Sequence, residues 1–319
     1  MAKERVDLLA RLRDKSRNKA LVKSVKQQLH QLKQAGRAVP DRQKRGWKRS
    51  ALDERMDETN FVTAFDGRGF RLILLLQDRG TGPRLLQAVE SDRTGIADFR
   101  SSRPTRSKLK DMLKQIEAAS ADRSETATAE EIFYFLKRAA ERNRQRKTQT
   151  PEGFVTALSY FEKPKSELDK HPLFAYAKPV ELEVPEGRLP GSEKLFADPL
   201  CADWSIGDME LRVFQRRLFD ELGESPDFRS AKASAIVDET VDRFFDEATR
   251  GAFHTRLMDL AWILARREKK GEALSAYAVA QALLDDKKPA SRIPFCRHLI
   301  ARFLPDGGET EAERKIIAP

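Results

Sequence analysis

The stretch from Asn60 to Arg100 constrains the fold most, because it is the one part of the chain without helical spacing. Its short apolar runs are divided by Asp-Gly, Gly-x-Gly-Pro and Asp-x-x-Gly turns. Such turns between short runs are typical of an antiparallel meander. The run from Phe70 to Leu76 carries apolar residues on both faces, so we expect a central strand that is covered on both sides.

Polar residues of this meander are expected at its turns and strand ends. Arg68, Arg71, Arg79 and Arg84 are placed there by the pattern, where they are exposed and could contact a ligand. Turn polarity alone is the simpler explanation for them. The meander is therefore expected to be a platform, with any contact site at its turns.

Helical spacing surrounds the meander and predicts an α+β fold that is predominantly α-helical. We expect an N-terminal αα-hairpin that ends near Gly36, the meander with helices covering it, and a C-terminal helical bundle. Thr128 and Glu131 form a capping-box pattern that predicts a helix start. The predicted organisation is a basic α+β domain (1–148), a proline-rich ordered wrapping segment (149–204), a helical bundle (205–305) and a polar tail (306–319).

The proline-rich segment is expected to be ordered. Seven of the 15 prolines fall between Pro151 and Pro199, which excludes long helices and central strands there. The same range is rich in Phe, Tyr, Leu and Val, which is too much apolar surface for a disordered linker.

Charge is distributed unevenly along the chain, whose net charge is +10. Residues 1–50 contain 16 Lys+Arg and 4 Asp+Glu, and residues 149–319 contain 25 against 30. Such asymmetry indicates a polyanion-binding N-terminal half. The alternatives are a solvated surface, or a basic half that docks on an acidic half or an acidic partner.

The candidate nucleic-acid contacts lie on the second predicted helix and in the connector after it. They are Lys19, Lys23, Lys26, Lys33, Lys44, Arg45, Lys48 and Arg49, which would contact phosphates, and Trp47, which would stack on a base. The alternative for Trp47 is that it folds back and covers the sheet edge while the neighbouring cations stay in water.

A candidate partner site lies on two predicted helices of the C-terminal half. Leu257, Leu264 and Tyr277, with small residues between them, resemble the spacing of a single tetratricopeptide-repeat hairpin. The pattern does not recur, and Asp285 stands where that family usually has proline. The resemblance implies an antiparallel helical hairpin, with a groove for a peptide or helix.

Catalytic and metal-binding motifs are absent from the sequence. The four histidines are far apart, and no His-Glu-x-x-His, Cys-x-x-Cys, phosphate-binding loop or Gly-x-Ser-x-Gly pattern occurs. Cys296 and His298 are close in sequence, but on a helix they point in different directions. We therefore predict a non-enzymatic protein with no cofactor and no metal.

The two cysteines cannot form a disulfide framework, and the longest apolar run, Leu72–Leu76, is too short to cross a membrane. These features favour a cytoplasmic protein with no membrane contact. Two functions remain. The leading hypothesis is a protein whose basic N-terminal half binds nucleic acid or a ribonucleoprotein. The alternative is a protein–protein interaction scaffold, in which the C-terminal hairpin holds a peptide and the basic half binds an acidic partner.

Overall fold

A computed structural model describes residues 60–78, 82–120, 122–177, 186–223, 228 and 230–304, together with Val25, Gln27, Gln28 and Gln34. The chain divides into two units, residues 1–54 and 55–319. All strands and helices with described bounds belong to the second unit. The predicted N-terminal αα-hairpin lies outside the described residues.

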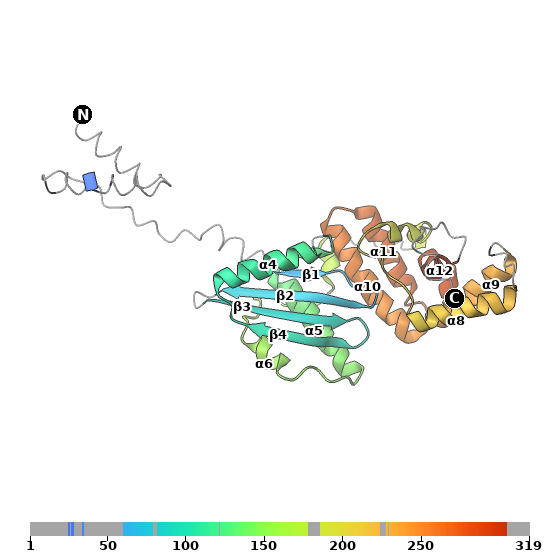
Figure 1. The fold of residues 1–319 in the computed structure, drawn as a ribbon, viewed down its shortest axis with the longest axis horizontal. Helices are drawn as coiled ribbons and strands as arrows, with labels where there is room; N and C mark the ends of the chain where they lie inside the picture. The colour runs from blue at the N-terminus through green and yellow to red at the C-terminus, as the bar shows by residue number, and fades with distance from the viewer. Residues whose placement is uncertain are drawn as a thin grey trace, which may run out of the picture. The chain divides into compact units, whose positions relative to one another are not determined.

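The sheet has five antiparallel strands in the order β4-β3-β2-β1-β5 (Figure 1). Their bounds are Phe61–Thr63 (β1), Phe70–Asp78 (β2), Pro83–Ser91 (β3), Gly95–Ser102 (β4) and Ser124–Thr126 (β5). The predicted meander is therefore confirmed for β1 to β4. Strand β5 is not predicted from the sequence, because its three residues are all polar and show no alternation of apolar and polar side chains.

Register along β2 assigns its side chains to two faces. Ile73 and Leu75 lie opposite Ala88 and Leu86, on the face that we call the inner face. Leu74 and its alternating neighbours lie on the outer face. Because β2 lies in the middle of the sheet, its side chains on both faces are available for burial.

Helix α5 (Ala129–Gln145) covers the inner face, and α6 (Phe154–Ser159) packs beside it through Phe154, which meets Phe99 of β4. From the C-terminal half, α10 (Glu247–Arg266) packs into the same core. The predicted capping box at the start of α5 is confirmed: the Thr128 hydroxyl accepts from the Glu131 N–H, and the Glu131 carboxylate accepts from the Thr128 N–H. One continuous core joins the sheet to the helical bundle.

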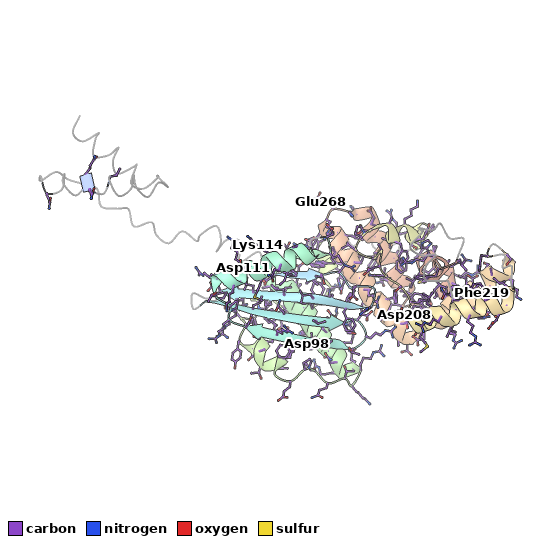
Figure 2. The ribbon with its side chains drawn as sticks, viewed as in Figure 1. Asp98, Asp111, Lys114, Asp208, Phe219 and Glu268 are labelled. Carbon is purple, nitrogen blue, oxygen red and sulfur yellow. The ribbon has the colours of Figure 1, made fainter. Side chains whose placement is uncertain are left out.

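The outer face has a smaller cover, the helix α4 (Arg106–Ser120). Leu109 packs with Leu74, Leu76 and Leu85 in a separate apolar cluster. In the view of Figure 1, no described helix lies in front of β3 and β4. In Figure 2, Asp98 lies on this open side, and Asp111 and Lys114 project from α4.

Besides α6, the described part of the proline-rich range forms three short 3-10 helices. They are η1 (Pro172–Ala175), η2 (Glu186–Arg188) and η3 (Ser192–Ala197). Leu173 and Leu195 are buried in the main core. Trp204, the last residue of the predicted wrapping segment, donates from its indole N–H to the Phe65 carbonyl at 2.9 Å, which ties the segment to the residues after β1.

The helical bundle agrees with the predicted series of helices. Its elements are α8 (Asp208–Leu222), α9 (Ala231–Phe244), α10, α11 (Lys270–Ala282), η4 (Ala290–Arg292) and α12 (Pro294–Ala301). Gly223 ends α8 in the left-handed region, with φ 81°. Between α10 and α11 the chain turns at Glu268, which has φ 60°.

Candidate functional site

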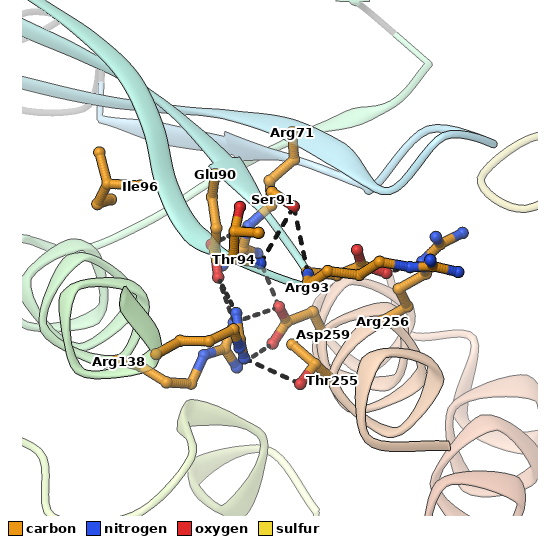
Figure 3. A network of polar contacts seen from close by, with 12 residues as sticks. Arg71, Glu90, Ser91, Arg93, Thr94, Ile96, Arg138, Thr255, Arg256 and Asp259 are labelled. Atoms are coloured by element: carbon orange, nitrogen blue, oxygen red, sulfur yellow. Dashed lines mark hydrogen bonds and ion pairs between the residues drawn. The ribbon is translucent and has the colours of Figure 1, made fainter. Parts of the chain in front are cut away.

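The most unusual feature of the described chain is a group of charged and polar side chains, buried or largely buried, between the sheet and the bundle (Figure 3). We call it the junction cluster. Its members come from β2, β3, α5, the residue before η1, and α10. They are Arg71, Glu90, Arg138, Arg142, His171, Thr255 and Asp259.

The sheet supplies the first ion pair of the cluster. Arg71 and Glu90 are Cα partners on β2 and β3, so both side chains reach the inner face. The Arg71 Nε donates to Glu90 Oε2 at 2.6 Å. The guanidinium lies 4.6 Å from the ring centroids of both Phe65 and Phe135. The sequence-based placement of Arg71 at an exposed strand end was wrong, because the residue is only 3% exposed.

Asp259 is the acceptor that joins the sheet to both helices. Its carboxylate receives two hydrogen bonds from Arg138, at 2.8 and 2.6 Å, and an ion pair from Arg71 at 2.9 Å. Burial by itself raises the pKa of Asp259, but Arg138 and Arg71 outweigh it and hold the pKa well below its ordinary value. Asp259 is therefore a buried, fully charged carboxylate.

His171 completes the shell of Asp259. Its Nδ1 accepts from the Leu173 N–H at 3.1 Å, which assigns the ring proton to Nε2. Nε2 lies 2.7 Å from Asp259 Oδ1 and donates to it. Burial lowers the pKa of His171, against the opposing effect of Asp259, so the imidazole is neutral at neutral pH.

Arg142 connects the cluster to α10 on its other side. Its Nη1 lies 2.9 Å from Glu90 Oε1, and its Nη2 donates to the Thr255 hydroxyl at 2.9 Å. Burial lowers the pKa of Arg142, but an arginine stays charged at any pH at which the protein folds. The cluster therefore holds three guanidinium groups against two carboxylates.

A second buried pair lies beside the cluster. Asp92 accepts from Arg256, whose guanidinium is 4.6 Å from the Phe253 ring centroid. Burial raises the pKa of Asp92, and Arg256 opposes that rise. Gly69 contacts this pair closely: its φ is 85°, and a Cβ built there would lie 2.4 Å from Asp92 Oδ1. The pair therefore requires glycine at the start of β2.

These contacts define what the junction cluster does in the described chain. A buried charge is tolerated when it is paired and hydrogen-bonded. Glu90 and Asp259 each contact more than one guanidinium, and those come from separate elements. The cluster therefore links α10 to α5 and to strands β2 and β3.

Both cysteine thiols, the candidate nucleophiles, are buried. Burial raises the pKa of the Cys201 thiol to about 12, and it also raises the pKa of Cys296. Neither thiol is therefore ionised at neutral pH. Within the described ranges, no group of three or more His, Cys, Asp or Glu side chains could hold a metal ion.

A surface pocket of about 620 Å³ lies where the chain enters β1. It is lined by Asn60, Leu76, Gln77, Asp78, Thr126, Ala127, Thr128, Ala129, Glu162 and Arg266. Its polar groups are engaged internally. The Gln77 amide donates to and accepts from the backbone of Glu162, and Arg266 contacts the carboxylates of Glu125 and Glu131.

The predicted site residues fall into two groups. The nine candidate nucleic-acid contacts, Lys19, Lys23, Lys26, Lys33, Lys44, Arg45, Trp47, Lys48 and Arg49, lie outside the described residues. Leu257 and Leu264 of α10 are fully buried in the core. Tyr277 of α11 is partly exposed and meets Phe174 edge-to-face at 6.3 Å. A partner at this hairpin could reach Tyr277 but neither leucine.

The sequence does not predict the junction cluster as a whole, although two of its residues carry a signal. Asp259 interrupts the apolar run Leu257–Leu264 of a helix, and Arg71 interrupts the run from Phe70 to Leu76. A single charge inside an apolar run indicates a buried ion pair. Which residues pair could not be read from the sequence, because Arg71 and Asp259 are far apart along the chain.

Comparisons with known proteins gave no relative: no family model, no curated protein and no solved structure matches this chain. Across the described ranges, the helices are too short or too polar to pass through a lipid bilayer.

Proposed function

We propose that this protein binds nucleic acid, or a ribonucleoprotein, through the basic residues of its N-terminal part. One observation carries the proposal, and it is the location of unbalanced positive charge. Residues 60–304 contain 41 Lys+Arg and 38 Asp+Glu, whereas residues 1–50 contain 16 and 4. A local excess of that size attracts a polyanion such as the phosphate backbone.

Ion pairs within residues 60–304, which we call the body, support this observation. Arg123 pairs with Asp203, Arg267 with Glu125 and Arg297 with Asp238, in addition to the arginines of the junction cluster. These guanidinium groups serve the fold. The basic surplus of residues 100–148 therefore falls on exposed side chains at both ends of the range, which are Arg100, Arg103, Lys108, Lys110 and Lys114 near its start and Arg146 and Lys147 near its end.

In this proposal, Lys19, Lys23, Lys26 and Lys33 and the connector cations contact phosphates. Such contacts give affinity without sequence preference. Trp47, between Arg45 and Lys48, stacks on an unpaired base. The nearly neutral body then positions the basic segment and supplies surfaces for further contacts.

The test is a titration of the full-length protein with labelled single-stranded RNA and duplex DNA at two salt concentrations. A variant with Lys44→Glu, Arg45→Glu, Lys48→Glu and Arg49→Glu should lose most of its affinity. Four lost phosphate contacts should also reduce the slope of log K against log salt by about 3 to 4 on duplex DNA.

A matched control reverses four exposed cations of the body, Lys165, Lys170, Arg212 and Lys287. This control carries the same change of net charge, so it should retain most of the binding if the connector is the site. Equal losses in both variants would mean that only overall charge matters. An absence of wild-type binding at low salt would reject the proposal.

The second candidate function is a protein–protein scaffold, and one observation favours it. Phe174 and Tyr176 are 41% and 43% exposed, and they lie beside Tyr277 and Arg266 on the α10–α11 side. Exposed aromatic side chains are enriched in protein interfaces. Selection of peptides from a random library on the wild-type protein, followed by loss of binding in Tyr277→Ala, would support this function.

A further inference from the structure

We infer that the open part of the sheet's outer face binds single-stranded nucleic acid, with Phe70 as the stacking platform. This inference rests on the proposed nucleic-acid function and names the form of nucleic acid bound. The open part, which we call the outer-face opening, is formed by Phe70, Leu72, Gln87, Val89, Asp98 and Arg100.

Register shows that these residues share one surface. Leu72 lies opposite Val89, and Val89 opposite Asp98, so three strands contribute to one row. Gln87 and Arg100 form the next row. Directly opposed residues of a sheet point to the same side. The opening is therefore continuous across β2, β3 and β4, as Figure 1 shows for the backbone.

Burial separates the opening from the covered half of the same face. Leu74 and Leu85 are fully buried under α4, whereas Leu72 and Val89 are only partly buried. Phe70 is 41% exposed. A phenylalanine on a sheet face, flanked by aliphatic side chains, presents a flat apolar surface of the kind on which unpaired bases stack.

Charge around the opening fits a polyanion. Arg100 lies on it, and Arg103, Lys108, Lys110 and Lys114 are exposed on the chain that follows, including the helix on the same face. Among the described side chains of β4 and α4, the exposed acidic ones are Asp98 and Asp111. Cations beside an exposed aromatic residue are the usual combination in single-strand binding.

The sheet edges argue against a peptide that adds a strand. At β4, the Asn143 side chain accepts from the Ile96 N–H at 2.7 Å and donates to the Ile96 carbonyl at 3.2 Å. At β5, Arg267 donates to the Ser124 carbonyl at 2.8 Å. Strand addition requires free backbone groups at an edge. A strand added at Ile96 or at Ser124 would have to displace these contacts.

The experiment compares Phe70→Ala with Phe219→Ala in the full-length protein. Phe219 of α8 is 45% exposed, so the control removes the same side chain at similar exposure from another surface. The probe is a single-stranded oligonucleotide of about 15 nucleotides, with its duplex as comparison. Phe70→Ala should weaken single-strand binding about fivefold or more and duplex binding less, whereas Phe219→Ala should change neither.

A second pair tests charge on the opening. Arg100→Glu should weaken single-strand binding more than Arg212→Glu, which makes the same change on an exposed position of α8. Crosslinking of an oligonucleotide that contains 4-thiouridine should attach it to peptides of β2 and β3. Crosslinks confined to residues before Asn60 would overturn the inference.

The outcomes separate the inference from the proposed function. Binding that the connector reversal abolishes and Phe70→Ala leaves unchanged would overturn the inference and retain the proposed function. No wild-type binding would overturn both. If Phe70→Ala instead alters self-association in sedimentation and leaves nucleic-acid binding unchanged, the opening is a contact between two copies, which also overturns the inference.

Discussion

The two faces of the sheet are built from the same strands but are covered in different ways. On the inner face, Ile73 and Leu75 belong to a core that continues through α5 into α10 and the bundle. On the outer face, Leu74 and Leu85 share a small cluster with Leu109 of α4. The inner cover also contains buried charges, whereas part of the outer face stays open.

This difference has a physical reason. A buried guanidinium or carboxylate requires fixed partners on every side, and helices from both halves of the chain provide them on the inner face. If one partner moved away, the remaining charge would be left unpaired in a region of low dielectric constant. The outer face has no such constraint, so it can leave aliphatic and aromatic side chains accessible to a ligand. The inner face is therefore the rigid one, and the outer face is the accessible one.

Removal of one charge from the junction cluster should have the largest effect on the inner face. Asp259→Asn leaves Arg71 and Arg138 short of a carboxylate in a buried site, and we expect a loss of about 3–5 kcal/mol in unfolding free energy. The control is Asp238→Asn, whose partner Arg297 is 39% exposed. It should cost less than about 1 kcal/mol. Urea unfolding followed by circular dichroism measures both.

Equal losses for the two variants would mean that the cluster contributes no more than a surface pair. A further check is the slope of the unfolding curve, because a variant that loosens the sheet–bundle junction should lower the m-value as well as the midpoint.

Truncation of one leucine on each face compares the two covers directly. Leu75→Ala opens a cavity in the inner core, where the surroundings cannot collapse, and should cost about 2–5 kcal/mol. Leu72→Ala removes a partly buried side chain beside the outer-face opening, and we expect about 1 kcal/mol. A loss at Leu72 as large as that at Leu75 would show that the opening is covered in solution.

Glycine replacements test the close contact behind the cluster. Gly69→Ala adds a Cβ that meets Asp92 and Arg256, both held in a buried ion pair, and should cost about 2–3 kcal/mol. Gly82→Ala has a similar φ of 102° but no atom within 4 Å of its new Cβ, so only backbone strain of about 1 kcal/mol is expected. Thermal unfolding distinguishes the two variants. Equal decreases in Tm would mean that the whole cost comes from backbone strain.

Much of the fold followed from local sequence patterns. The β1–β4 meander and the cap at Thr128 each depend on a few neighbouring residues, so the sequence predicts them directly. β5 was missed because its pairing with β1 is set by tertiary contacts.

The candidate site was harder to predict for the same reason. The junction cluster joins residues from Arg71 to Asp259, and no local pattern indicates which of many charged side chains meet in space. The sequence predicts Arg71 at an exposed strand end because Arg71 closely follows an Asp-Gly turn. The apolar surroundings that bury it come from α5, which lies much later in the chain.

The pH dependence of stability should give the smallest effect, and His171 is its source on the inner face. Burial lowers the pKa of His171 in the folded protein, whereas the unfolded chain keeps a value near 6.5. As pH falls below 6.5, the unfolded chain therefore takes up a proton that the folded protein does not. Stability should fall by at most about 1.4 kcal/mol per pH unit from this group, until the folded pKa is reached.

His171→Gln isolates that contribution, because an amide N–H can still donate to Asp259 but does not titrate. The difference between the wild-type and variant curves of unfolding free energy should be flat above pH 7 and should change below pH 6.5. His254 and His298, whose pKa values burial also lowers, titrate in both proteins and so cancel in the difference. Parallel curves from pH 7 to pH 5 would mean that the folded protein protonates His171 as readily as the unfolded chain, and that the inner face is open to solvent at this end.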